Sequence, residues 1–372
     1  MSLNLKGAVV VITGASSGIG QATAQAFARH GSRLVLAARN GDALNTVAAQ
    51  CRRLGGQAEV MVTDVTDAAA VKALAEKAQS LGRIDVWISN VGVGAVGRFE
   101  ETPIEAHEQI IRANLIGHIN DAHAVMPIFL RQQKGVFINM ISLGGFAAAP
   151  FATAYSASKF GLRGFSEALR AELADKPNIH VCDIYPAFVD TPGLKHGANY
   201  VEREITAPPP LLDPRQVAAA IVHVARHPKP TTTVGVVTNA TRLAHLLAPN
   251  LAARSLARLM SAYFKRAAPA GGSDGNLYAP SRDAARIDGG LRSHQALSPT
   301  FALGLTALGL IAVAAVVAQR QHSHRQLSHR QLSLRQLNQR QFNQRQHDHR
   351  QKPFAGPLDW QRATGFFSSK WR

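Results

Sequence analysis

Residues 8–29 read AVVVITGASSGIGQATAQAFAR and contain an apolar run, a glycine-rich turn and an alanine-rich segment, in that order. The run 8–12 is rich in β-branched residues, as expected of a parallel strand that is buried on both faces. The glycines let the backbone approach a ligand closely, and free N–H groups at the start of the following helix stabilise an anion. The stretch therefore predicts a strand, turn and helix that bind the pyrophosphate of a dinucleotide.

Strands and helices are predicted to alternate along the chain that follows. Further strand-like runs lie at 33–39, 59–63, 84–88, 135–142, 179–185 and 234–238. Helical segments lie at 41–55, 67–81, 153–174, 213–227 and, as one or two helices, 240–265. This alternation is typical of an α/β fold, and we expect a Rossmann-type doubly wound parallel sheet of about seven strands.

Tyr155 and Lys159 are four residues apart in the predicted helix 153–174, so both side chains lie on one face of it. A phenol has a pKa of about 10 and is a poor acid or base at neutral pH unless a nearby positive charge stabilises its phenolate. Lys159 supplies such a charge. Taken alone, the pair is also compatible with an ordinary helix, so its meaning depends on the other motifs.

The combination of Thr13-Gly-x-x-x-Gly18-x-Gly20 with Tyr155-x-x-x-Lys159 resembles the classical short-chain dehydrogenase/reductase (SDR) family. The resemblance covers roughly residues 5–265. It implies an oxidoreductase that uses a nicotinamide cofactor, and it says little about the substrate.

The resemblance implies four catalytic residues, which are Asn114, Ser142, Tyr155 and Lys159. Ser142 lies thirteen residues before Tyr155, as in the family, and its hydroxyl would donate a hydrogen bond to the substrate oxygen. Tyr155 would protonate that oxygen during carbonyl reduction or deprotonate it during alcohol oxidation. Lys159 would lower the pKa of Tyr155 and hold the nicotinamide ribose. Asn114 would hold a water that links the lysine to solvent, although a buried asparagine at a helix kink gives the same pattern.

The end of the strand 33–39 is where a dinucleotide fold contacts the adenosine ribose. An acidic residue there favours NAD, whereas this chain has Ala38 and Arg39, and a guanidinium suits a 2′-phosphate. We therefore expect NADP(H), with a solvated arginine in an NAD-linked enzyme as the alternative, and we expect no metal. The cofactor contacts that the resemblance implies are Gly14, Ser16, Ser17, Gly18, Ile19, Gly20, Arg39, Asp64, Val65, Asn90, Gly92, Tyr155, Lys159, Pro186, Val189 and Thr191.

Two of these segments depart from the family pattern. Ser89-Asn90-Val91-Gly92 stands where the family has Asn-Asn-Ala-Gly, and Ala187 replaces the glycine of Pro-Gly-x-Val-x-Thr. Residues 192–214 stand where the family has a mobile substrate lid, a kind of loop that determines specificity. Side chains that would either line an apolar pocket there or simply pack are Phe146, Phe151, Phe188, Leu194 and Tyr200.

Composition indicates a reduced, cytoplasmic catalytic domain. Cys51 and Cys182 are too few for a disulfide framework, and no signal peptide opens the sequence. The formal net charge is +17, but residues 319–372 hold eleven Lys and Arg against two Asp, which is a charge of +9. The basic bias of the domain itself is therefore mild, which argues against a nucleic-acid partner.

Three further segments are predicted after a catalytic domain at 1–265. Residues 266–300 are rich in Gly, Ser, Asp and Pro and are expected to form a linker. Residues 301–318 are uncharged and apolar, and as a helix they would reach ~27 Å, which predicts a membrane-associated segment or else a buried or oligomerising helix. Residues 319–372 repeat Arg-Gln every five residues up to Arg350, and we expect a disordered tail that binds an anionic membrane surface. Placing such a basic tail beyond a membrane crossing conflicts with the positive-inside tendency, so whether 301–318 crosses the membrane is left open.

The sequence thus predicts an NADP(H)-dependent SDR oxidoreductase that interconverts a secondary alcohol and a ketone or aldehyde, with a lipophilic substrate. The family resemblance also implies a homodimer or homotetramer. The alternative is an NADPH-sensing regulatory or scaffold protein that its basic tail recruits to membrane or nucleic acid. An intact catalytic set favours the enzyme.

Overall fold

We describe a computed structural model, which covers residues 3–207, 210–281 and 283–292. The apolar segment predicted at 301–318 and the basic tail predicted at 319–372 lie outside the described residues. So does the last part of the predicted linker, 293–300.

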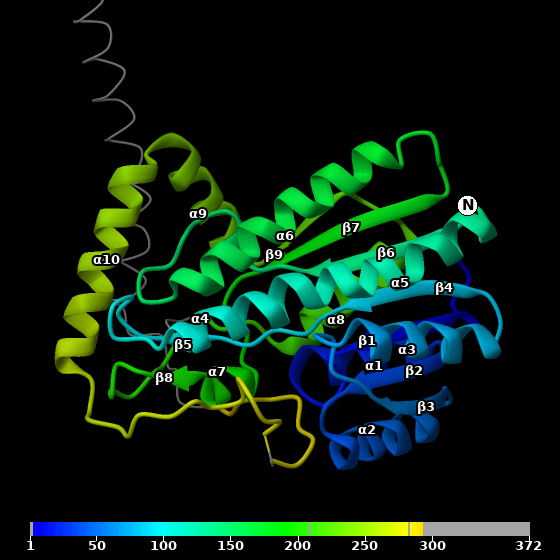
Figure 1. The fold of residues 1–372 in the computed structure, drawn as a ribbon, viewed down its shortest axis with the longest axis horizontal. Coiled ribbons are helices and arrows are strands. Elements are labelled where there is room, and N and C mark those ends of the chain that lie inside the picture. The colour runs from blue at the N-terminus through cyan, green and yellow to red at the C-terminus, as the bar shows by residue number, and fades with distance from the viewer. Residues whose placement is uncertain (1–2, 208–209, 282, 293–372) are drawn as a thin grey trace, which may run out of the picture. The chain divides into compact units, whose positions relative to one another are not determined.

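The core of the protein is a seven-stranded sheet with the strand order β3-β2-β1-β4-β6-β7-β9, in which every neighbouring pair is parallel (Figure 1). The strands are β1 (Val9–Thr13), β2 (Arg33–Ala38), β3 (Gln57–Val62), β4 (Ile84–Ser89), β6 (Gly135–Met140), β7 (Ile179–Pro186) and β9 (Thr231–Val234). The predicted Rossmann-type doubly wound sheet is therefore confirmed. The order of the strands reverses between β1 and β4, and ligands of such sheets bind at the carboxyl ends of the strands near this point.

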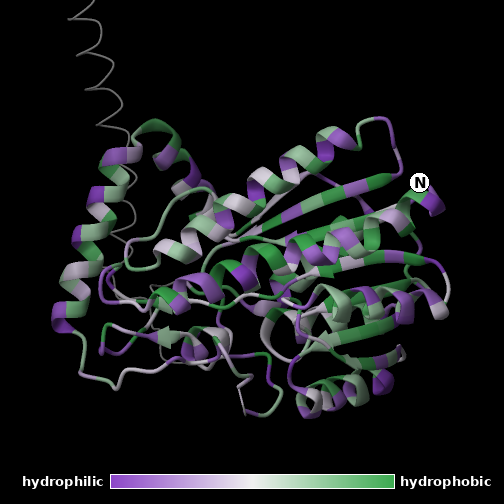
Figure 2. Ribbon diagram, in the orientation of Figure 1, coloured by the Kyte–Doolittle hydropathy of each residue, from purple (hydrophilic) through white to green (hydrophobic). Residues whose placement is uncertain are grey.

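Helices cover both faces of the sheet. The main ones are α1 (Gly18–Arg29), α2 (Gly41–Arg53), α3 (Ala68–Ser80), α4 (Ile104–Ile111), α5 (Gly117–Gln132), α6 (Thr153–Glu172) and α8 (Pro214–Arg226). Apolar side chains of α1, α2 and α8 pack on one face, and those of α3, α5 and α6 pack on the other. Figure 2 shows the resulting pattern, with hydrophobic strands in the centre and helices of mixed character around them.

Local sequence accounts for several of the helix boundaries. The Asn40 side chain accepts a hydrogen bond from the Ala43 N–H at 2.9 Å and so caps α2, and Asp213 caps α8 in the same way ahead of a proline. The strand predicted at 234–238 is misplaced: β9 ends at Val234. Gly235 has φ +92°, a conformation that suits glycine, and turns the chain into α9 (Val236–Leu247).

A smaller layer lies beyond the carboxyl ends of the strands. It contains a two-stranded parallel sheet, β5 (Ala95–Val96) with β8 (Ala198–Asn199), the short helix α7 (Gly193–His196), and the helices α9 and α10 (Pro249–Arg266). No helix within the described ranges has the length and apolar character needed to cross a membrane.

We call residues 268–281 and 283–292 the strap. Its composition predicts a linker, yet in the structure it runs along the domain and bonds to it repeatedly. The backbone of Ser273 pairs with that of Asn199, the Arg286 carbonyl accepts from the Gly18 N–H, and the Gly289 N–H donates to the Asp190 carbonyl. The strap therefore forms part of the surface around the carboxyl ends of the strands.

Candidate active site

Tyr155 and Lys159 lie on one face of α6, beside the end of β6. The Lys159 side chain is almost completely buried, and its Nζ donates a hydrogen bond to the Met140 carbonyl at 3.0 Å. The same nitrogen lies 5.7 Å from the centre of the Tyr155 ring. The predicted pairing of a phenol and an amine on one helix face is therefore present in the structure.

Ser142 lies two residues after the end of β6 and is held in an unusual backbone conformation, with φ 148° and ψ 165°. That region is normally restricted to glycine, so the conformation is strained. The Ser142 hydroxyl accepts a hydrogen bond from the Gly144 N–H at 3.2 Å. A Cβ at Gly144 would lie 3.3 Å from the Tyr155 ring and 3.7 Å from the Ser142 hydroxyl oxygen, so two of the predicted catalytic side chains lie close together.

Asn114 lies in a π-helical turn, Arg112–Ile116, between α4 and α5. Its side chain is fully buried: Oδ1 accepts from the Val93 N–H and Nδ2 donates to the Val93 carbonyl, both at 2.8 Å. Nδ2 also lies 3.3 Å from the Ser158 hydroxyl. Asn114 thus fixes the segment after β4 to α6, and single π turns of this kind are frequent at functional sites.

Burial dominates the proton affinities of the pair. It raises the pKa of Tyr155, and the nearby Ser142 hydroxyl opposes this rise. It lowers the pKa of Lys159 to about 7, because removal from water disfavours the charged ammonium. The sequence predicts that Lys159 lowers the pKa of Tyr155; in the structure, desolvation of the phenol is the largest effect and raises that pKa.

Two buried titratable residues of α5 were not predicted from the sequence. His118 contacts the Val91 carbonyl through Nε2 at 2.8 Å and the Asn139 Oδ1 through Nδ1 at 2.9 Å. Burial, and then the charge of Lys159, lower the pKa of His118 to about 4, so the imidazole is neutral. Asn114 and His118 therefore hold consecutive parts of the chain after β4.

Asp121 joins the ends of β1 and β4. Its Oδ2 accepts hydrogen bonds from the Thr13 hydroxyl at 2.9 Å and the Ser89 hydroxyl at 2.6 Å. Burial raises the pKa of this carboxyl to about 7 against those two hydrogen bonds. Asn114, His118 and Asp121 are spaced four and three residues apart, which places them on one face of a helix. This spacing is the sequence signal that could have identified His118 and Asp121.

The glycine-rich turn has the close approach that a dinucleotide needs. Gly14 has φ +67° and lies against Asn90, whose Nδ2 donates to the Gly14 carbonyl at 3.2 Å. A Cβ at Gly20 would overlap that same carbonyl oxygen. Ser16, Ser17 and Ile19 are partly exposed around the N-terminus of α1. The cradle formed by these residues fits a pyrophosphate, since side chains at Gly14 and Gly20 would crowd the neighbouring backbone and fill it.

The ribose end of the predicted cleft contains Arg39, Asp64 and Val65. Arg39 follows β2, and its guanidinium donates to the carbonyls of Asn276 and Leu277 in the strap. The Asp64 carboxylate accepts from Thr66, and Val65 is buried against Gly117. Arg39 therefore lies at the strand end where the fold contacts the ribose, with strap carbonyls as its partners.

The remaining predicted cofactor residues lie at the ends of β4 and β7. Gly92 lies near the Lys159 ammonium: a Cβ there would be 4.0 Å from Nζ. Pro186 ends β7, Val189 is buried, and Thr191 contacts Gly18 at the start of α1. The structure thus brings all sixteen predicted cofactor residues to the carboxyl ends of the strands.

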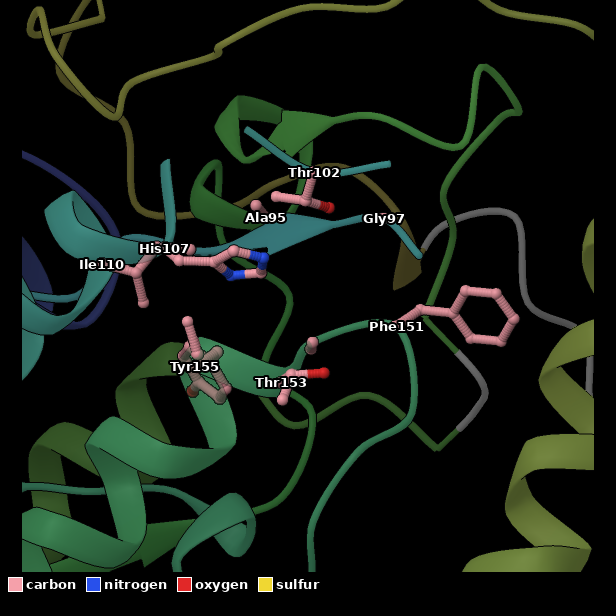
Figure 3. Close-up of a pocket in the computed structure, with 10 residues that line it drawn as sticks. Ala95, Gly97, Thr102, His107, Ile110, Phe151, Thr153 and Tyr155 are labelled. Atoms are coloured by element: carbon pink, nitrogen blue, oxygen red, sulfur yellow. The ribbon is translucent and has the colours of Figure 1, made fainter. Parts of the chain in front are cut away.

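A pocket opens beside Tyr155, as Figure 3 shows. Ala95 and Gly97 border it on one side, Tyr155 and Thr153 of α6 on the other, and the His107 ring points into it. Its remaining lining residues are Thr102, Ile110, Phe151, Ala152 and Ala154. The lining is mostly apolar, with four polar side chains, which are those of Thr102, His107, Thr153 and Tyr155.

The aromatic residues predicted for such a pocket divide between lining and packing. Phe151 lines it, but its ring points away in Figure 3 and packs on Phe264 of α10, with 5.1 Å between ring centres. Phe146 is buried and stacks on Tyr185, with ring centres 4.2 Å apart, so it belongs to the core. Within residues 3–207, 210–281 and 283–292, no group of three or more His, Cys, Asp or Glu side chains is arranged to hold a metal ion.

Comparison with known proteins supports the same interpretation of the fold and the site. The family model for short chain dehydrogenases matches residues 8–199. The chain is 32% identical over 260 residues to the oxidoreductase YxnA of Bacillus subtilis (strain 168), which covers 69% of this chain and 73% of that protein. It is 34% identical over 191 residues to the 3-oxoacyl-[acyl-carrier-protein] reductase FabG of Thermotoga maritima, covering 51% of this chain and 77% of the relative.

Solved structures are similar as well. An alcohol dehydrogenase of the archaeon Thermococcus sibiricus, complexed with 5-hydroxy-NADP, has a TM-score of 0.54 and 27% identity over 62% of this chain and 96% of that one. A short chain dehydrogenase/reductase of Burkholderia phymatum in complex with NAD has a TM-score of 0.57 over 73% of this chain and 99% of that one; at 24% identity it supports the fold alone. With a parallel sheet, a glycine-rich turn and the Ser142, Tyr155 and Lys159 cluster at its edge, the chain belongs to the short-chain dehydrogenase/reductase family of oxidoreductases.

Proposed function

We propose that this protein is an NADP(H)-dependent oxidoreductase that interconverts a secondary alcohol and a ketone or aldehyde, with Tyr155 as the general acid and base. The observation that carries the proposal is the cluster of Ser142, Tyr155 and the buried Lys159 at the end of β6. The Ser142 hydroxyl would orient the substrate oxygen, and Tyr155 would move the proton to or from it. A bound nicotinamide supplies or accepts the hydride.

Lys159 and Asn114 are proposed to act through Tyr155 and the cofactor ribose. A lysine whose pKa is lowered to about 7 by burial exchanges its proton readily near neutral pH. It would therefore return a proton to Tyr155 after each turnover. Asn114 is bonded to Val93, after β4, and to Ser158 in α6. It would hold these two segments in fixed positions while the proton is exchanged.

The preference for NADP(H) rests on Arg39. The residue follows β2, its guanidinium forms hydrogen bonds with two carbonyl oxygens, and no carboxylate occupies the strand end. A guanidinium that donates to two neutral carbonyl oxygens would bind a doubly charged 2′-phosphate more strongly. The similarity to a dehydrogenase complexed with an NADP derivative agrees with this preference.

A lipophilic substrate is proposed from the pocket beside Tyr155 and from the helices that follow β9. Apolar side chains form most of the pocket lining. On α9 and α10, Leu243, Leu246 and Leu259 are more than half exposed, and residues 236–266 carry five Lys and Arg with no Asp or Glu. A basic surface with exposed leucines suits an anionic membrane surface, from which such a substrate would be taken up.

A homodimer or homotetramer is the proposed assembly. Ile116, Leu130 and Phe160, on the helical segments that carry Asn114 and Tyr155, are 37–42% exposed. Large apolar side chains at such positions suit a symmetric interface between copies of the chain.

The direct test is a panel of carbonyls and alcohols with NADPH, NADH and their oxidised forms, with cofactor absorbance as the readout. We expect turnover of apolar ketones or aldehydes with NADPH, at a kcat/KM at least about tenfold above that with NADH. Tight NADPH binding with no turnover of any panel member would favour the NADPH-sensing alternative.

A further inference from the structure

We propose that the strap is an autoinhibitory segment that occupies the dinucleotide cleft and must leave before NADP(H) binds. This inference rests on the proposed function, because it assumes that the cleft takes a dinucleotide. It is carried by the hydrogen bonds that the strap makes to the groups expected to bind phosphate, and by two anchors that hold it there.

At the ribose end, two carbonyl oxygens of the strap accept hydrogen bonds from the Arg39 guanidinium. Nη1 donates to the Leu277 carbonyl at 3.2 Å and Nη2 to the Asn276 carbonyl at 2.6 Å. The neighbouring Asn40 donates through Nδ2 to the Ser281 carbonyl at 2.8 Å. These carbonyl oxygens stand where the oxygens of a 2′-phosphate would accept, so strap and phosphate exclude each other at Arg39.

At the pyrophosphate end, a carbonyl oxygen of the strap accepts a hydrogen bond from the backbone of the glycine-rich turn. The Gly18 N–H, at the first residue of α1, donates to the Arg286 carbonyl at 3.0 Å. The N-terminus of a helix favours an anion, and a neutral carbonyl is a weaker acceptor than a phosphate oxygen. A dinucleotide would therefore displace the strap, and the affinity measured for it would include the free energy needed to do so.

Leu277 is the apolar anchor of the strap. Its side chain is completely buried in a cluster that includes Ala106, Ile110 and Ala154, with Tyr155 packed against the cluster. The Gln109 side chain also donates to the Leu277 carbonyl at 3.1 Å. One strap residue is thus bound both to the Arg39 region and to the surroundings of the proposed catalytic tyrosine.

Arg292 is the ionic anchor at the other end. Its guanidinium pairs with Asp190 at 3.2 Å, Asp213 at 2.8 Å and Asp288 at 2.6 Å. Asp190 is almost completely buried and also accepts from the backbone N–H groups of Leu291 and Arg292. It directly precedes Thr191, so this anchor ties the strap to the loop expected to contact the nicotinamide.

The strap also holds the predicted substrate lid. The Asn276 N–H donates to the His196 carbonyl at 2.8 Å, and the Tyr200 hydroxyl donates to Asp274 at 2.8 Å. The Ser273 and Asn199 backbones exchange hydrogen bonds at 3.0 and 2.8 Å. Departure of the strap would therefore release the lid, which couples cofactor binding to opening of the substrate entrance.

Variants of the full chain test the inference through binding, without turnover. The apparent Kd of a ligand equals its intrinsic Kd divided by the fraction of protein molecules in the open, binding-competent state. Leu277→Ala and Arg292→Gln each weaken one anchor, so the apparent Kd for NADPH, measured by nicotinamide fluorescence, should fall by about fivefold or more. Tyr278→Ala is the matched control, because this half-exposed strap residue should leave the Kd unchanged.

Hydrogen exchange of the wild-type chain gives a second readout that needs no variant. We expect the amides of Gly289 and Leu291, which donate to Asp190, to exchange faster when NADPH is bound. Slower exchange of these amides would overturn the autoinhibitory role in favour of a strap that clamps over bound cofactor. Anchor variants that bind NADPH as the wild type does, or more weakly, would overturn it in favour of a clamp or a passive segment. If neither the wild type nor the variants bind NADPH at all, the proposed function itself fails, and this inference with it.

Discussion

The Lys159 ammonium lies 5.7 Å from the centre of the Tyr155 ring and is bonded to the carbonyl of Met140 at the end of β6. This arrangement buries an amine that has no carboxylate partner among the contacts described. Its consequences for the pH dependence of stability are specific, because burial lowers the pKa of Lys159 to about 7.

Replacement of Lys159 should remove a rise in stability with pH. An unfolded lysine keeps its proton up to about pH 10, so between about pH 7 and pH 10 the unfolded wild type binds more protons than the folded protein, and its free energy of unfolding increases. Lys159→Met lacks this increase. Its stability relative to wild type should be greatest at about pH 7 and fall toward pH 10, by at most about 1.4 kcal/mol per pH unit, in urea denaturation. A difference that stays constant over that range would contradict the assigned burial of the amine.

Replacement of Asp121 should act with the opposite sign. Burial raises the pKa of Asp121 to about 7, so between about pH 4 and pH 7 the folded wild type binds more protons than the unfolded chain and loses stability as the pH rises. Asp121→Asn keeps an acceptor for Thr13 and Ser89 but does not titrate. We expect the variant to gain about 2 kcal/mol relative to wild type between pH 5 and pH 7. Asp42→Asn, at an exposed position, is the control and should show no such gain.

Two substitutions of Ser142 should separate its backbone strain from its hydroxyl. Ser142→Ala and Ser142→Gly both remove the hydroxyl, and each should lower kcat by about a hundredfold. Glycine adopts φ 148° without a Cβ clash, so Ser142→Gly should be more stable than Ser142→Ala by about 1 kcal/mol or more. Thermal or urea denaturation of the two variants checks this, and equal stability would show that the backbone at 142 is unstrained.

Replacement of Arg39 should change the cofactor preference. In Arg39→Asp, a carboxylate stands where we propose the 2′-phosphate binds, so the Kd for NADPH should rise at least about tenfold and the preference should shift toward NADH. Arg53→Asp, the same change at the exposed end of α2, should leave both Kd values unchanged. An Arg39→Asp protein that still prefers NADPH by the wild-type factor would contradict the assigned role.

Much of the fold was predictable because its elements carry strong local signals. The segment 8–29 became β1, the glycine-rich turn and α1, and the predicted helices 41–55 and 153–174 became Gly41–Arg53 and Thr153–Glu172. The error at 234–238 came from β-branched residues that continue past Gly235, whose positive φ ends the strand. β-propensity alone does not locate such a boundary.

The positions of the strap and of the buried polar residues of α5 have weaker signals in the sequence than the strands and helices do. Residues 268–281 and 283–292 attach through backbone carbonyls, the buried Leu277 and the ion pairs of Arg292, and composition does not report which of these groups find partners. His118 and Asp121 resemble a solvated helix face in the sequence. Only the packing of α5 against the ends of β1 and β4 buries them, and this is a tertiary effect.

The most direct test of the central claim compares wild type with Tyr155→Phe at saturating NADPH and a ketone that the wild type reduces. Tyr185→Phe is the control, because it also loses a buried phenol hydroxyl, one that contacts Asp183 and lies outside the proposed site. We predict that all three proteins bind NADPH alike, that Tyr185→Phe keeps its kcat, and that Tyr155→Phe loses about a hundredfold to ten-thousandfold in kcat. A Tyr155→Phe protein that reduces the ketone at the wild-type rate would contradict the account.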